Sequence, residues 1–185
     1  ALVSGPVFEP TPYMCRALRL FEACREQLGE EIELVHDVHE RVHPIQAVRF
    51  AKDVEKFRLF FLEDALSPED IDYFKMIRQQ CATQIAMGEL FNNPHEWIPL
   101  ISQRLIDFIR IHPSQAGGLT PCRKIAALGE MFNVRTAWHG PGDLSPIGAA
   151  CSITLDVAIQ NFGVQEHTPF SARVQEVFQG CPVIK

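Results

Sequence analysis

The sequence predicts a parallel α/β protein in which strands and helices alternate, and the arrangement it favours is a barrel. Short apolar segments rich in β-forming residues recur along the chain, and each ends in a polar residue capable of chemistry. Helical patterns lie between these segments, and several begin with a capping residue followed by proline. The interval between strand ends matches one strand, one helix and two loops, which is the repeat of a parallel α/β protein.

Six segments are predicted to be strands. Each is short and apolar, as a strand buried in a parallel sheet should be. In chain order they are IELVHD (32–37), RLFFLED (58–64), QIAMGE (84–89), FIRIHP (108–113), VRTAWHG (134–140) and NFGVQE (161–166).

Helices are predicted before the first strand and between the later ones. Apolar residues from Met14 to Leu28 fall on one helical face, and Gly29 then supplies a C-terminal stop. Later helices are expected to begin where a capping residue precedes a proline at the first helical position. These pairs are Ser67-Pro68, Thr120-Pro121 and Ser145-Pro146, with His43-Pro44 as a weaker example.

Polar residues at the end of every strand favour a barrel over a doubly wound sheet. A barrel builds its active site from several strands at one face, whereas a doubly wound sheet concentrates its site at one switch point. A complete barrel has eight βα units in about 250 residues, so six strands in 185 residues predict an incomplete barrel. Within one domain we expect a linker remnant over 1–12, the βα units over 13–170 and the start of a C-terminal tail over 171–185.

Composition excludes several classes of protein. The net charge of −6 argues against nucleic acid as the main partner. No apolar stretch is long enough to cross a membrane, and the first ten residues do not have the pattern of a signal peptide. Six cysteines without a C-x-x-C pair are interpreted as reduced, small buried residues of a cytoplasmic protein.

Three carboxylates predict a metal site. Asp37, Glu63 and Glu89 stand at the ends of successive predicted strands, at equal intervals of 26 residues. Neighbouring strands lie about 4.8 Å apart, so these acids should converge at the mouth of the barrel and repel one another. A hard divalent cation removes the repulsion, and an all-oxygen ligand set suits magnesium. Surface acids in loops are the alternative interpretation for any one of the three alone.

Other polar residues are candidates for catalysis or binding. His39 lies two residues beyond Asp37, so alternation along an extended strand end would point both to the same side, and histidine suits general acid or base work. Arg110 inside a strand needs an anion, which could be a substrate carboxylate or a structural partner such as Glu89. Residues near the last two strand ends could bind substrate hydroxyls or only line a wet barrel mouth; these are His139, Asp143 and Glu166.

The chain resembles the enolase superfamily, specifically its mannonate dehydratase branch, which includes starvation-sensing proteins. The motifs that carry the resemblance agree in order and spacing from about residue 14 to residue 170. They are LVHDVHER, FFLEDALSPE, IAMGELFNNPHEW, LIDFIRIHPSQAGGLT, TAWHGPGDLSPIG and NFGVQEH.

The resemblance implies a (β/α)7β TIM-like barrel with one Mg2+ per subunit on Asp37, Glu63 and Glu89. It implies that His39 is the acid that assists the departing hydroxyl. The implied reaction is dehydration of D-mannonate or D-gluconate to 2-keto-3-deoxy-D-gluconate, by removal of the α-proton and stabilisation of the enediolate. The positions that would contact the sugar acid are His39, Glu89, Arg110, His139, Asp143 and Glu166. Relatives of this kind assemble as homo-oligomers, often tetramers or octamers.

Two departures from the family pattern give rise to alternatives. The family's base is a tyrosine paired with an arginine, and neither motif is recognised here, since Tyr13 does not match it. The N-terminal capping domain is not recognised either. These 185 residues alone are therefore expected to be inactive. The alternatives are a low-activity or regulatory relative that keeps the metal site, and a dehydratase for another acid sugar.

Overall fold

A computed structural model describes residues 8–183 of the chain. It is an α/β protein in which helices and short parallel strands alternate, as predicted. The chain divides into two compact units, one ending at Ile85 and the other beginning at Ala86. In each unit, strands that follow one another in the sequence are hydrogen-bonded neighbours.

The first unit contains two paired strands. β1 (Val35–Asp37) and β2 (Phe61–Glu63) are parallel, and Asp37 lies opposite Glu63 in the register. Within β2, the amide of Leu62 donates to the carbonyl oxygen of Gln84. The helices of this unit are α1 (Pro10–Leu28), α2 (Pro44–Val54), the short 3-10 helix η1 (Glu55–Phe57) and α3 (Ile71–Gln80).

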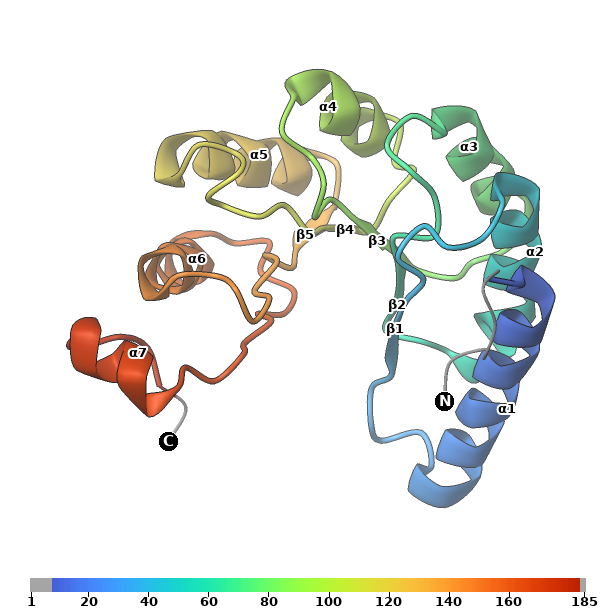
Figure 1. The fold of residues 1–185 in the computed structure, drawn as a ribbon. Helices are drawn as coiled ribbons and strands as arrows, with labels where there is room; N and C mark the ends of the chain where they lie inside the picture. Colours follow the sequence, from blue (N-terminus) through green and yellow to red (C-terminus); the bar gives the residue numbers. More distant parts are fainter. Residues whose placement is uncertain (1–7, 184–185) are drawn as a thin grey trace. The chain divides into compact units, whose positions relative to one another are not determined.

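The helices of the first unit cover one face of its strands. Helices α1, α2 and α3 lie together beside β1 and β2 (Figure 1). Their core is fully buried and includes Phe50 on α2, Leu62 on β2 and Phe74 on α3. At the end of α1, the Arg25 side chain donates to backbone carbonyl oxygens of Phe57 and Ile32, which ties the loop before β1 to the end of η1.

The second unit contains the later strands. They are β3 (Ile85–Met87), which the unit boundary crosses after its first residue, β4 (Phe108–Ile109) and β5 (Arg135–Thr136). The three are parallel neighbours, with Ala86 opposite Phe108 and Phe108 opposite Arg135. An isolated bridge joins Thr136 to Phe162. The helices are α4 (Pro94–Ser102), α5 (Leu119–Met131), α6 (Pro146–Ala158) and α7 (Ala172–Val177).

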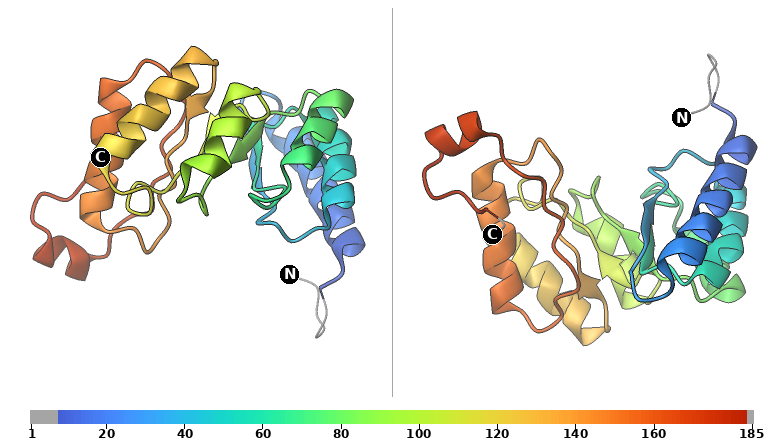
Figure 2. Two further views of the ribbon diagram at one scale, coloured as in Figure 1. Left: turned by 90° about the horizontal axis from the view of Figure 1, so that it is seen from above. Right: turned by 90° about the horizontal axis from the view of Figure 1, so that it is seen from below.

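Packing in the second unit centres on its strands and on helices α5 and α6. These two helices run side by side (Figure 2). Trp138, Phe108 and Leu100 are fully buried. The short α7 buries none of its residues, so it contributes little to this core.

Several predicted boundaries differ from the structure. Residues 161–166 form a single bridge rather than a sixth strand, because the Gly163 and Val164 amides both donate to the carbonyl oxygen of Thr136 and the ladder does not continue from there. Helix α3 begins at Ile71 and not at Pro68, since residues 68–70 form a turn. Helix α5 begins at Leu119, after Gly118 and not after a threonine cap. The starts at Pro44 and Pro146 are confirmed, and Ser145 accepts a hydrogen bond from the Gly148 amide.

The sequence interpretation did not identify the start of helix α4, and it missed helix α7. Helix α4 begins with a capping box, in which Asn93 accepts from the His95 amide and Glu96 accepts from the Asn93 amide. The signal was visible as Asn93 followed three residues later by Glu96. Helix α7 was also missed, although Ser171 caps it.

The cysteines are free thiols, as expected, but most are not buried. Cys122 is buried, whereas Cys15 is exposed and the others are partly exposed. The interpretation of all six as small buried residues is therefore wrong. Over residues 8–183, no helix has the length and apolar character needed to cross a membrane.

Candidate functional site

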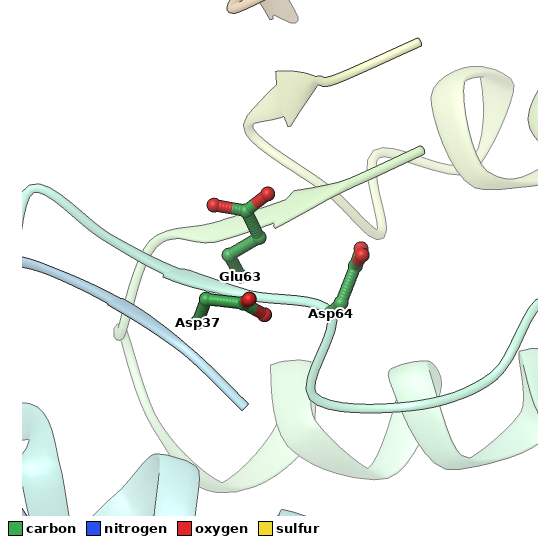
Figure 3. Close-up of side chains that lie close together, drawn as sticks. All are labelled: Asp37, Glu63 and Asp64. Carbon is green, nitrogen blue, oxygen red and sulfur yellow. The ribbon is translucent and has the colours of Figure 1, made fainter. Parts of the chain in front are cut away.

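The first unit gathers three carboxylates at the ends of its strands. Asp37 is the last residue of β1, Glu63 is the last residue of β2, and Asp64 follows directly (Figure 3). One carboxylate oxygen from each lies within 4.8 Å of the others. Glu63 and Asp64 are buried, with 6% and 1% of their surface exposed, while Asp37 is exposed.

Backbone hydrogen bonds hold these acids in place. The Val38 amide donates to the Glu63 carbonyl oxygen at 2.9 Å, and the Glu40 amide donates to the Asp64 carbonyl oxygen at 2.8 Å. The parallel register of β1 and β2 therefore continues into the loops that follow them. Asp64 has a φ of 41°, a conformation that costs energy for a residue with a side chain and that occurs often at functional sites.

The arrangement fits a hard divalent cation. Three carboxylates close together, two of them buried, repel one another unless a positive charge lies between them. The three carboxylates offer only oxygen atoms as ligands, which suits Mg2+ or Mn2+ and not a soft metal. Because Asp37 is exposed, an ion held by these carboxylates would be accessible to water or to oxygen atoms of a substrate.

Aromatic side chains surround His36, the residue directly before Asp37. The hydroxyl of Tyr13 and Nε2 of His36 share a hydrogen bond of 2.7 Å. Burial, together with the nearby Arg41 charge, lowers the pKa of His36 to about 4. Burial also raises the pKa of Tyr13 to about 12 against the opposing effect of Arg41. Both side chains are therefore neutral at physiological pH.

His39 lies in the turn that follows β1. The strand ends at Asp37, and His39 has a φ of 55°. The extended alternation that predicted its direction stops before it, so that argument is wrong. His39 is exposed, and its imidazole is accessible from solvent close in sequence to Asp37.

The second unit gathers charged residues of both signs. Glu166 accepts hydrogen bonds through Oε2 from Nη2 of Arg110 at 2.8 Å and from the Gly140 amide at 2.7 Å. Nε2 of His139 lies 3.1 Å from Oε2 of Glu89 and 4.0 Å from Oε2 of Glu166. Arg110 is buried, with 4% of its surface exposed, so its charge is balanced within the protein.

Neighbouring charges shift the pKa values in this group. Burial opposes ionisation of Glu166, but the Gly140 amide and the Arg110 charge outweigh it and place the pKa of Glu166 below its ordinary value. Burial and the nearby His139 lower the pKa of His112, although Asp143 and Glu166 oppose the change. The His112 and His139 rings meet edge to face, with centroids 5.6 Å apart.

Gly88 allows the backbone just before Glu89 to approach the neighbouring strand closely. Gly88 has a φ of 143°, and a Cβ atom there would lie 3.0 Å from the backbone carbonyl carbon of Arg110. Only a residue without a side chain allows the two backbones to approach so closely. The end of β3, and with it Glu89, is therefore positioned against the end of β4.

The structure thus brings together some of the predicted metal ligands and some of the predicted binding residues. Asp37 and Glu63 are neighbours, and Glu89, Arg110, His139 and Glu166 form one network in the second unit. That Glu89 joins Asp37 and Glu63 on one metal ion stays a prediction, as do the roles of His39 and of Asp143, which lies in an exposed turn. The sequence argument missed Asp64, because the regular spacing selects one acid per strand and Glu63 already filled that place.

Comparison with known proteins places the chain in a family. Residues 8–185 match the family described as "Enolase C-terminal domain-like". The chain belongs to this family, which confirms the resemblance to the enolase superfamily. The narrower assignment to the mannonate dehydratase branch stays a prediction.

Similar proteins carry dehydratase names. The chain is 53% identical over 180 residues to D-galactonate dehydratase family member SEN1436 of Salmonella enteritidis PT4 (strain P125109), covering 97% of this chain and 43% of the relative. It is 52% identical to D-galactonate dehydratase family member RspA of Pantoea ananatis (strain LMG 20103), with the same coverage. The chain therefore spans less than half the length of these relatives.

Two solved structures share the fold. An enolase from Pantoea ananatis with bound D-gluconate and Mg has a TM-score of 0.94 and 50% identity, and the match covers 100% of this chain and 44% of that one. A mandelate racemase/muconate lactonizing enzyme-like protein from Rubrobacter xylanophilus DSM 9941 has a TM-score of 0.82 and 26% identity, covering 98% and 46%.

Proposed function

We propose that this chain carries the cation site and sugar-acid-binding residues of a magnesium-dependent sugar-acid dehydratase, a hydro-lyase. The carboxylate cluster at the ends of β1 and β2 is the observation that carries the proposal. The Pantoea ananatis enolase with bound D-gluconate and Mg supports it, because that protein is 50% identical to this chain.

Asp37, Glu63 and Glu89 are assigned as ligands of one Mg2+ per subunit, and Asp64 adds negative charge beside the first two. A bound divalent cation polarises a substrate carboxylate and stabilises the charge that develops when the neighbouring proton leaves. The buried carboxylates fix where the acid group of a substrate is held, and the exposed Asp37 leaves that place open to it.

The remaining residues are assigned to the sugar acid. His39 can donate a proton to the departing hydroxyl, since its imidazole is exposed in the turn after β1. Arg110 and His139 supply positive or donor groups in a network that Glu89 and Glu166 hold in place. Asp143, in the following turn, is assigned to a substrate hydroxyl.

The substrate proposed first is D-mannonate or D-gluconate, giving 2-keto-3-deoxy-D-gluconate. The names of the similar proteins favour a second candidate, D-galactonate. The test measures formation of a 2-keto-3-deoxy acid by the full-length protein with each of the three acids, with Mg2+ and then with EDTA. Turnover that requires Mg2+ supports the proposal.

A matched pair of variants sharpens the test. Glu63→Gln should abolish turnover, whereas Glu69→Gln, an exposed acid in the following loop, should leave it unchanged. A full-length protein that neither converts nor binds any of the three acids in the presence of Mg2+ would overturn the proposal. Binding without turnover would instead favour a regulatory relative.

A further inference from the structure

The hydrogen bond between Tyr13 and His36 joins helix α1 to strand β1. The two polar atoms are 2.7 Å apart, and the two rings lie nearly parallel, with centroids 5.9 Å apart. His36 and Tyr13 are both partly buried. The bond therefore links two elements that are separated by the whole loop between residues 28 and 35.

Aromatic rings enclose His36 from two helices. Phe21 on α1 meets the His36 ring edge to face at 5.0 Å, and Phe50 on α2 does so at 5.9 Å. Phe21 and Phe50 are buried. The imidazole is thus held by packing as well as by its bond to Tyr13, and it has little freedom to turn.

The geometry of a strand couples His36 to Asp37. Successive side chains point to opposite faces, so a histidine directed at α1 and α2 directs the next residue to the other face. β1 is three residues long, and among the residues that the structure describes its ladder partner is β2. Backbone hydrogen bonds to the β2 segment hold one edge of β1, from the Phe60 amide to the Leu34 carbonyl oxygen and from the Val38 amide to the Glu63 carbonyl oxygen. A side-chain contact on the face that meets α1 and α2 adds a second point that fixes the orientation of the strand.

We infer that Tyr13 and His36 are positioning residues, which hold strand β1 in the rotation that keeps the Asp37 carboxylate beside Glu63 and Asp64. The inference rests on the proposed cation site. Tyr13 does not touch substrate or cation in this role. It acts through His36 and the backbone of β1, so its effect appears as cation affinity rather than as chemistry.

The test measures the Kd of Mn2+ by electron paramagnetic resonance, using the full-length protein well below its unfolding temperature. Tyr13→Phe removes one hydroxyl and keeps the ring. It should raise the Kd roughly fivefold, the size expected for the loss of one hydrogen bond. Tyr73→Phe is the matched control, because Tyr73 is the other tyrosine of the chain and lies on α3, and it should bind Mn2+ like the wild type.

A second pair of variants tests the partner. His36→Gln keeps a polar group for Tyr13 and should retain most of the affinity, whereas His36→Leu, which keeps only the apolar packing, should lose affinity as Tyr13→Phe does. If Tyr13→Phe does not fold, the two His36 variants test the positioning role in its place. A purely structural bond would lower the unfolding temperature of Tyr13→Phe and leave the Kd unchanged.

Unchanged Mn2+ affinity in folded Tyr13→Phe, or in His36→Leu, overturns the inference while leaving the cation site intact. An equal loss in Tyr73→Phe overturns it as well, since the effect would not be specific to β1. Failure of the wild type to bind Mn2+ overturns the proposed cation site and the inference with it.

Discussion

The two units of the chain differ in how their charged side chains are grouped. The first places Asp37, Glu63 and Asp64 together, all of one sign. The second places Glu89 and Glu166 against Arg110 and His139, so that negative and positive groups are paired within hydrogen-bonding distance. Both groups stand where parallel strands end, on the same alternation of strand and helix.

The first group thus concentrates charge of one sign, whereas the second pairs charges of both signs. Like charges that are buried together favour any cation that can lie between them. A paired network needs no ion to be stable, and it loses stability when one partner is removed. We therefore expect the first group, together with Glu89, to determine cation affinity, and the pairing of Arg110 with Glu166 in the second to determine stability and the recognition of an anion.

The largest effect is expected from Glu63→Gln. The Kd for Mn2+ should rise by at least about 100-fold, above the 10–100-fold range typical of changes outside the ligand shell. The same variant should resist urea better than the wild type when no cation is present, because one repelling charge has been removed. Mn2+ titration and urea unfolding with EDTA measure the two effects, and Glu69→Gln serves as the control. Unchanged Mn2+ affinity would contradict the assignment.

The next effect is expected from Gly88→Ala in the second unit. The added Cβ would lie 3.0 Å from backbone atoms of Arg110 and Ile111, at a φ of 143°. Strain of this kind costs of order 1–3 kcal/mol, and the close contact adds to it. Urea unfolding measures the loss. Gly118→Ala is the matched control, because Gly118 also has a positive φ but nothing within 4 Å of the added atom. Equal losses in both variants would show that the close approach has no importance.

Arg110→Met tests the pairing within the second unit. The variant leaves the carboxylate of Glu166 without its guanidinium partner, and the loss of a charged hydrogen bond costs about 1.5–3 kcal/mol. We expect a loss near 2 kcal/mol in urea unfolding, since Glu166 is partly exposed and keeps the Gly140 amide. Arg123→Met, on the exposed side of α5, should change stability little. If Arg110→Met is as stable in urea as the wild type, the proposed difference between the two units is wrong.

The smallest effect is expected from Asp156, an acid on α6 outside both groups. Burial raises its pKa from an ordinary value of 3.8 to about 6, against the opposing effect of the neighbouring Trp138 side chain. The folded state therefore binds this proton more tightly than the unfolded state does. Its ionisation costs stability progressively as the pH rises from about 4 to about 6, and the cost is complete above that range.

Asp156→Asn removes this cost while keeping the size and shape of the side chain. The variant should be more stable than the wild type at pH 8 and equally stable at pH 4. The gain should be less than about 1 kcal/mol, because solvent screens a half-buried carboxylate. Thermal unfolding at both pH values measures it, with Glu130→Gln, an exposed acid, as the control. A larger gain at pH 4 than at pH 8 would contradict the sign.

Much of this arrangement was predictable from the sequence, for identifiable reasons. The alternation of strand and helix follows from short apolar segments and from proline after a capping residue, as at Ser145-Pro146. The placement of Asp37 and Glu63 at neighbouring strand ends follows from their regular interval. The predicted strands are longer than the observed ones, although backbone hydrogen bonds such as that from the His139 amide to the Ile111 carbonyl oxygen continue the pairing beyond them.

The sequence by itself determined that Asp37 and Glu63 stand at the ends of neighbouring strands, since chain order and spacing place them there in a parallel α/β fold. Only the tertiary structure decided which other polar side chains meet. Asp64 joins the first group through a left-handed backbone that no spacing rule predicts. Arg110 pairs with Glu166, 56 residues further along the chain. The reason is that hydrogen bonds and ion pairs act over a few ångströms in space, and distances of that size depend on register and backbone conformation rather than on position in the sequence.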